Sequence, residues 1–174
     1  LEMFKQRGMG HIGGCLSVTE LISVLYGKQM KVDPKNPNWE GRDYLVMSKG
    51  HAAPAVEAAL AELGFFDKKL LLTMDDIGTR IPSHVDRLLT PGIDVTCGSL
   101  GQGASVAAGI AYGLKHAGIT DQYVYVCIGD GELNEGQNWE AFQFMAHNKL
   151  NNCIVFIDNN KRQHDGYCDE VLKP

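Results

Sequence analysis

Residues 128–160, IGDGELNEGQNWEAFQFMAHNKLNNCIVFIDNN, hold an acidic GDG turn (129–131) and an asparagine pair (159–160) one helix and one strand apart. Each of these polar segments follows an apolar run, as expected at the end of a buried strand. In open parallel sheets, ligands bind beyond the carboxyl ends of the strands. Two neighbouring parallel strands joined by a crossover helix would therefore bring Asp130 and Asn160 to the same edge of a sheet.

The rest of the chain extends this pattern to a layered fold. Apolar runs near residues 44–48, 123–128 and 153–157 do not alternate with polar residues, which is typical of strands covered on both faces. Helical patterns separate these runs. The sequence therefore predicts an α/β fold with a mostly parallel sheet and helices on both faces.

Local signals predict several helices. The segment HAAPAVEAALAELG (51–64) reads as a helix with Pro54 in its first turn and a glycine at its end. Ser17-Val-Thr-Glu20 fits a capping box for an earlier helix. Residues 104–118 read as a helix of unusually small side chains, which we expect to be buried or to lie at a subunit contact.

Composition narrows the class of protein. The chain has 174 residues, an apolar share of 44% and a formal net charge of -5, with no basic run that would follow a nucleic-acid backbone. No apolar stretch reaches the roughly 20 residues that span a bilayer. The five scattered cysteines lack a C-x-x-C pair and suit a reducing compartment, so we expect a cytoplasmic protein.

The two ends of the sequence suggest a piece of a longer polypeptide. The chain begins at Leu1 and stops at Pro174, just after an expected loop. We expect residues 1–174 to form a single diphosphate-binding domain that continues beyond the last residue.

The residues of the opening segment favour a divalent cation. Asp130 offers a carboxylate and Asn160 an amide oxygen, which are hard ligands suited to Mg²⁺ or Ca²⁺. Gly129 and Gly131 lack Cβ atoms, so main-chain N–H groups can approach a phosphate closely. A lone GDG is weak, but GDG with an asparagine pair at the next strand end is far more specific. This chemistry suggests a diphosphate held through a divalent cation.

The spacing resembles the thiamine diphosphate motif, in which GDG precedes NN by 25–30 residues. The stretches GMGHIGG, SKGHAAPAVEAALAELG, PSHVDRLLTPGIDVTCGSLGQG and DNNKRQHDG together resemble transketolase. The resemblance covers nearly the whole chain and looks most like the N-terminal, diphosphate-binding half of a transketolase split between two polypeptides. It implies the thiamine diphosphate-binding fold.

The resemblance also implies a set of site residues. Mg²⁺ would be bound by Asp130, Asn160 and the main-chain oxygen of Arg162. The thiamine diphosphate contacts implied are the following: His51, Gly98, Leu100, Gly131, Glu135 and Asn160. The catalytic set implied consists of His11, His51 and His84 on the substrate side and Glu135 in a carboxylate network between subunits. His164 stands where many relatives have an apolar residue, a departure that affects the contacts beyond Asn160.

The implied reaction moves a two-carbon ketol unit from a ketose phosphate to an aldose phosphate. A glutamate that activates the cofactor would come from a C-terminal subunit or module, so we expect this chain alone to have no turnover. The implied assembly is a homodimer of a longer polypeptide or a heterotetramer, with no nucleic acid and no membrane as partner.

Three alternatives remain open. The first is another thiamine diphosphate enzyme, similar to deoxyxylulose-phosphate synthase or acting on sulfonated or branched sugar phosphates. The second is a nucleotide-binding domain, and the third is a non-catalytic scaffold subunit. Outside the motif, we expect Glu132 to be a solvated turn residue, and Lys49 and Arg80 either to bind phosphate or to face solvent.

Overall fold

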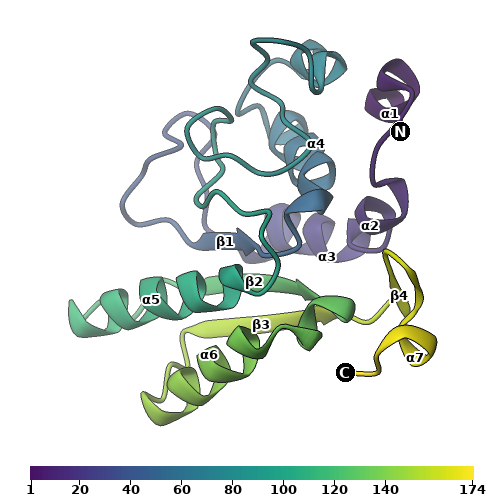
Figure 1. The fold of residues 1–174 in the computed structure, drawn as a ribbon. Coiled ribbons are helices and arrows are strands. Elements are labelled where there is room, and N and C mark those ends of the chain that lie inside the picture. The colour runs from purple at the N-terminus through teal and green to yellow at the C-terminus, as the bar shows by residue number, and fades with distance from the viewer. The chain divides into compact units, whose positions relative to one another are not determined.

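The computed structural model describes residues 1–174 and divides them into two compact units (Figure 1). The first, here the helical unit, comprises residues 1–43 and 50–98. The second, here the sheet unit, comprises residues 44–49 and 99–174. None of the helices combines the length and the apolarity needed to cross a bilayer.

The sheet unit is built on three parallel strands in the order β1-β2-β3. Their bounds are β1 Tyr44–Met47, β2 Val124–Gly129 and β3 Cys153–Asp158. The predicted parallel sheet is confirmed, because each strand lies within about a residue of its expected range. The central strand β2 is buried along nearly its whole length, as its unbroken apolar run indicated.

Two helices connect these strands. Helix α5 spans Gln102–His116 and helix α6 spans Gly136–His147, after a short 3-10 helix, η4, at Gly131–Asn134. Helix α5 contacts all three strands and packs along α6, so both helices cover the same face of the sheet (Figure 1). The small side chains of α5 allow this close approach, and a Cβ atom on Gly103 would overlap Ser48 at the end of β1.

The sheet unit ends in a hairpin and a short helix. The hairpin strands are β4 Arg162–Gln163 and β5 Gly166–Tyr167, and helix α7 spans Cys168–Val171. The hairpin begins two residues after the asparagine pair. It therefore fixes the chain that follows β3.

The helical unit contains short helices and one longer one. Their bounds are α1 Glu2–Arg7, α2 Ile12–Leu16, α3 Thr19–Val24, the π-helix η1 Leu25–Gln29, the 3-10 helix η2 Gly50–Ala52, α4 Ala53–Leu63 and the 3-10 helix η3 Lys68–Thr73. Helix α4 packs against α2 and α3 through apolar side chains such as Val56 and Leu60. Its predicted end is confirmed, because Gly64 adopts the left-handed conformation at its C-terminus (φ 89°).

The predicted capping box at residues 17–20 is wrong. The N-cap of α3 is Val18, and no side chain caps this helix. The Ser17 hydroxyl donates instead to the Gly14 carbonyl, and the Thr19 hydroxyl donates to the Cys15 carbonyl. Both hydroxyls thus bond back to the preceding helix, a local alternative that Ser and Thr offer wherever a free carbonyl lies within reach.

Candidate active site

The sheet brings the acidic turn and the asparagine pair to one edge. Gly129 pairs with Asp158 in the parallel register, and the Asp130 N–H donates to the Asp158 carbonyl at 3.2 Å. The main-chain N–H of Lys161 donates to Oδ2 of Asp130 at 2.6 Å. The Asp130 carboxylate therefore contacts the residue next to Asn160.

The loop after β3 turns back on itself around Asn160. Its side-chain oxygen accepts a hydrogen bond from the Arg162 N–H at 2.9 Å, and its amide nitrogen donates to Asp158 at 3.1 Å. Lys161, between Asn160 and Arg162, has a positive φ of 66°, a strained conformation for a residue with a side chain. The Arg162 guanidinium donates to the Tyr167 hydroxyl at 2.6 Å and stacks on its ring.

The Asp130 carboxylate and the Asn160 amide oxygen, which the structure brings to one edge of the sheet, are hard oxygen donors of the kind that divalent cations prefer. The position of the main-chain oxygen of Arg162 as a third ligand stays a prediction. The structure contains no cluster of three or more His, Cys, Asp and Glu side chains that could hold a metal. A set with one carboxylate suits Mg²⁺, which usually completes its coordination with water and phosphate oxygens.

The GDG turn leaves no room for side chains at its end. The Asp130 side chain caps η4 and accepts from the Gly131 N–H at 2.9 Å. A Cβ atom on Gly131 would lie 2.7 Å from Cβ of Gln163 in the β4–β5 hairpin. Glycine is therefore required by the packing of the turn against the hairpin.

Two charged residues beside the turn are buried, which corrects the solvent-facing roles considered for them above. Lys49 is only 1% exposed and pairs with Asp158 at 2.5 Å, so it does not face solvent. Glu132 is 2% exposed and not a solvated turn residue. Its carboxylate accepts hydrogen bonds from the Gly101 N–H at 2.8 Å, from the Gly129 N–H at 3.0 Å and from the Ser48 hydroxyl.

Glu135 and Leu100 lie in the same unit and are both exposed. Glu135 immediately precedes helix α6, and a Cβ atom on Gly101 would lie 2.7 Å from Cβ of Glu135. Leu100 comes directly before Gly101, so the loop that carries it runs against the start of α6. An exposed carboxylate here is accessible to another chain.

In the helical unit, three of the predicted histidines lie together. The ring centroid of His11 is 5.2 Å from that of His51 and 5.7 Å from that of His84. A Cβ atom on Gly98 would lie 3.3 Å from the His84 ring. Partial burial, and then the charge of His11, lower the pKa of His84, and the carboxylate of Asp75 opposes this shift. The neutral imidazole of His84 is thus favoured near pH 7.

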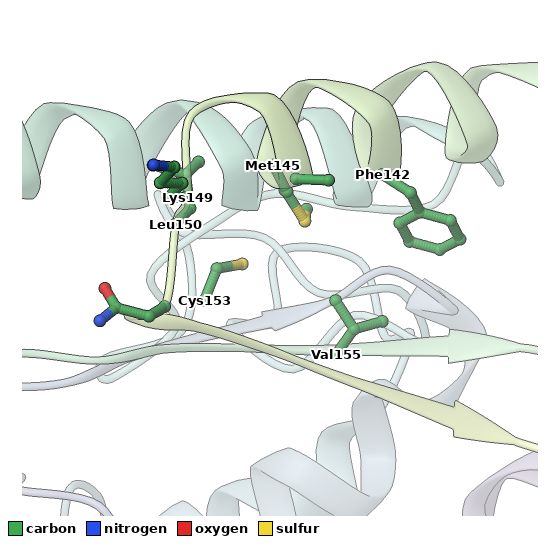
Figure 2. Close-up of a pocket in the computed structure, with 8 residues that line it drawn as sticks. Phe142, Met145, Lys149, Leu150, Cys153 and Val155 are labelled. Atoms are coloured by element: carbon green, nitrogen blue, oxygen red, sulfur yellow. The ribbon is translucent and has the colours of Figure 1, made fainter.

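An apolar hollow of about 460 Å³ lies between helix α6 and strand β3, away from the carboxyl ends of the strands (Figure 2). Its walls include Phe142, Met145 and Leu150 together with Cys153 and Val155. Cys153 begins β3, whereas the asparagine pair follows the other end of that strand. The hollow offers no acidic or histidine side chain and is not the candidate active site.

The fold and the strand-end cluster define an α/β domain with oxygen ligands at the carboxyl edge of a parallel sheet. Residues 1–173 match the family described as transketolase, thiamine diphosphate binding domain. The chain therefore belongs to the transketolase family, as its thiamine diphosphate binding domain.

Individual relatives agree with this assignment. The chain is 48% identical, over 98% of its own length and 62% of the relative's, to a 6-deoxy-6-sulfo-D-fructose transketolase subunit, SqwG, of Clostridium sp. (strain MSTE9). It is 39% identical, over 94% of its own length and 59% of the relative's, to an apulose-4-phosphate transketolase subunit of Actinobacillus succinogenes. The crystal structure of a transketolase from Campylobacter jejuni superposes with a TM-score of 0.92 at 31% identity, over 99% of this chain and 28% of that one. The chain thus spans about three fifths of the subunits and about a quarter of the complete transketolase.

Proposed function

We propose that this chain is the cofactor-binding part of a transketolase, which transfers a two-carbon ketol unit from a ketose phosphate to an aldose phosphate. The observation that carries the proposal is the contact of the Asp130 carboxylate with the loop of Asn160–Arg162, at the carboxyl edge of a parallel sheet, in a chain of this family. In this proposal, Mg²⁺ is bound by Asp130, Asn160 and the main-chain oxygen of Arg162.

The remaining cofactor contacts follow the same proposal. The Gly131 N–H and the His51 imidazole would meet the diphosphate, and the backbone at Gly98 and Leu100 would meet the aminopyrimidine. When bound, thiamine diphosphate supplies a carbon nucleophile and an electron sink.

The histidine cluster would handle hydroxyl groups of the sugar. A neutral imidazole has one nitrogen that donates and one that accepts, so His84 could hold a hydroxyl group or take up its proton. The ring centroids of His11 and His51 are 5.2 Å apart, so both imidazoles could share this role. The exposed Glu135 would join a carboxylate network with another subunit.

We further propose that a partner subunit or module completes the enzyme. The partial coverage of the relatives, two of which are named as subunits, supports this. The partner would supply the glutamate that activates the cofactor, in a homodimer of a longer polypeptide or in a heterotetramer. The five cysteines form no disulfide, in keeping with the cytoplasmic location that we propose.

A sulfonated sugar is a second candidate substrate. The relative that is 48% identical to this chain is named as a transketolase subunit for 6-deoxy-6-sulfo-D-fructose. Comparing turnover of this sugar with that of fructose 6-phosphate, at equal concentration and with one aldose phosphate acceptor, separates the two candidates. A higher kcat/KM for the sulfonated sugar would select it.

The test of the cofactor site is calorimetric titration of the full-length protein, together with any partner that it requires, with thiamine diphosphate in the presence of Mg²⁺. D130N keeps the size of the side chain but removes its charge, so Mg²⁺-dependent binding should be lost. D169N makes the same change on the exposed surface of α7 and should bind as the wild type does. Unchanged binding by D130N would exclude Asp130 as a metal ligand.

A further inference from the structure

The buried carboxylate of Glu132 joins three segments of the sheet unit that are distant in sequence. Oε1 accepts from the Ser48 hydroxyl and from the Gly101 N–H, and Oε2 accepts from the Gly129 N–H. Ser48 follows β1, Gly101 is the N-cap of α5, and Gly129 ends β2. One side chain therefore fixes the ends of two strands and the start of a helix.

The backbone of Glu132 is fixed as well. The side-chain amide of Asn138, a buried residue in α6, donates to the Glu132 carbonyl at 2.6 Å. With both its main chain and its carboxylate bonded, Glu132 has little freedom to move. At 2% exposure it has no surface with which to touch a bound molecule.

Only a carboxylate satisfies this arrangement. Three donors converge on two oxygens, and an ionised carboxylate accepts at both while donating at neither. A glutamine would direct its NH₂ group either at the Gly129 N–H or at the Gly101 N–H. In either orientation, two donors would face each other in a buried site, which leaves both groups unpaired.

We propose that Glu132 is a positioning residue for the cofactor site, holding the GDG turn and the loop before α5 in one fixed relation. This inference rests on the proposed function, because these two segments contain Gly131 and Leu100, the proposed diphosphate and aminopyrimidine contacts. Glu132 acts on the cofactor through the backbone of these segments and does not contact it.

The experiment compares E132Q with the wild type in the full-length protein assembled with its partner. Loss of a group that orients the ligands of a bound metal typically costs about 10- to 100-fold in affinity or activity, and we expect a comparable effect here. E132Q should therefore raise both the Kd and the KM for thiamine diphosphate by at least about tenfold at saturating Mg²⁺. Bound cofactor should restore the positions of the GDG turn and of the loop before α5. The kcat at saturating cofactor should therefore fall much less than the kcat/KM for thiamine diphosphate.

Three further variants distinguish positioning from a general loss of stability. E132D keeps the charge with a shorter reach and should recover part of the affinity. S48A removes one of the three donors and should raise the Kd by a smaller factor than E132Q does, because the Gly101 and Gly129 N–H groups still bind the carboxylate. E140Q makes the same change as E132Q on the exposed face of α6 and should leave the Kd unchanged.

The outcomes separate this inference from the proposed function. If the wild type itself does not bind thiamine diphosphate, the proposed function fails. If the wild type binds and folded E132Q binds equally well, the positioning role is overturned, even if urea unfolding shows that the variant is less stable than the wild type. If E132Q does not fold, S48A decides: a raised Kd at unchanged kcat supports the role, and an unchanged Kd overturns it.

Discussion

The stability of the helical unit should depend on one buried carboxyl group. Glu57, in the middle of α4, is 0% exposed, and neither of its side-chain oxygens has a hydrogen-bond partner. The Thr90 hydroxyl nearby in the same unit donates instead to the Arg80 carbonyl. Burial, and then the negative charge of Asp75, raise the pKa of Glu57 from its ordinary value of 4.5 to about 8, against a smaller lowering by the nearby Thr90 hydroxyl. The folded protein therefore keeps Glu57 protonated at neutral pH.

The sign and the size of the effect follow from this difference in pKa. Between about pH 4.5 and pH 8, the folded chain holds a proton that the unfolded chain releases, so wild-type stability falls as pH rises and levels off above pH 8. Each unit of pKa difference corresponds to about 1.4 kcal/mol. E57Q supplies a neutral group of the same shape and removes this loss. The free energy of unfolding of E57Q should equal that of the wild type near pH 4.5. It should be larger by roughly 3 kcal/mol at pH 7 and by roughly 4 kcal/mol at pH 8.

The assay is urea unfolding of wild type and E57Q followed by circular dichroism at pH 5, 6, 7 and 8. E62Q, on the exposed end of the same helix, removes the same charge and should differ from wild type by less than about 0.5 kcal/mol at every pH. The decisive quantity is the difference in free energy of unfolding between E57Q and wild type as a function of pH. If this difference does not increase from pH 5 to pH 8, the conclusion that Glu57 is protonated in the folded chain is refuted.

Three further changes test the packing and the charges described above. K49M leaves the carboxylate of Asp158 without its buried cation and should lower the free energy of unfolding by about 3–5 kcal/mol. K49M combined with D158N should lose less than the sum of the two single changes. Strictly additive losses in urea unfolding would contradict an energetic interaction between the two side chains. G103A should destabilise by about 1–3 kcal/mol, since its methyl group would collide with the end of β1, while G109A, in open space on the same helix, should stabilise by up to about 1 kcal/mol; thermal melts that shift equally would exclude this difference. His84 should titrate by NMR below its ordinary pKa of 6.5, because partial burial and a neighbouring imidazole disfavour its charged form; a midpoint at or above 6.5 would be inconsistent with this environment.

The sheet could be predicted from the sequence because its signals are local. The apolar runs at 44–48, 123–128 and 153–157 each mark a strand without reference to the rest of the chain. Helix α4 was equally readable, since Pro54 suits the first turn of a helix and Gly64 suits the position after its end. The parallel arrangement followed from the alternation of strands and helices. Once the strands were parallel, Asp130 and Asn160 had to share an edge.

The roles of Glu132 and Lys49 could not be predicted, because their partners are distant in sequence. Glu132 binds groups that lie 31 and 84 residues away, and the partner of Lys49 lies 109 residues away. A charged residue in a glycine-rich turn is ordinarily solvated, so local context pointed to the surface. Only the register of β1 against β2 brings Ser48 and Lys49 beside the acidic turn. The predicted capping box failed for another reason, since the Ser17 and Thr19 hydroxyls donate to carbonyls of the preceding helix and do not cap α3.

The charges at this edge of the sheet are a physical reason for the divalent cation that we propose there. Asp130, Glu132 and Asp158 place three carboxylates on buried or half-buried side chains, and Lys49 is the buried cation among them. The exposed cations of the following loop are screened by water and salt and offset this charge less effectively. A diphosphate approaching alone would meet two uncompensated negative charges in a medium that screens them poorly. A divalent cation bound at Asp130, as proposed, would remove that repulsion and offer the diphosphate a ligand. The arrangement that holds the strand ends together would then also make anion binding depend on the metal.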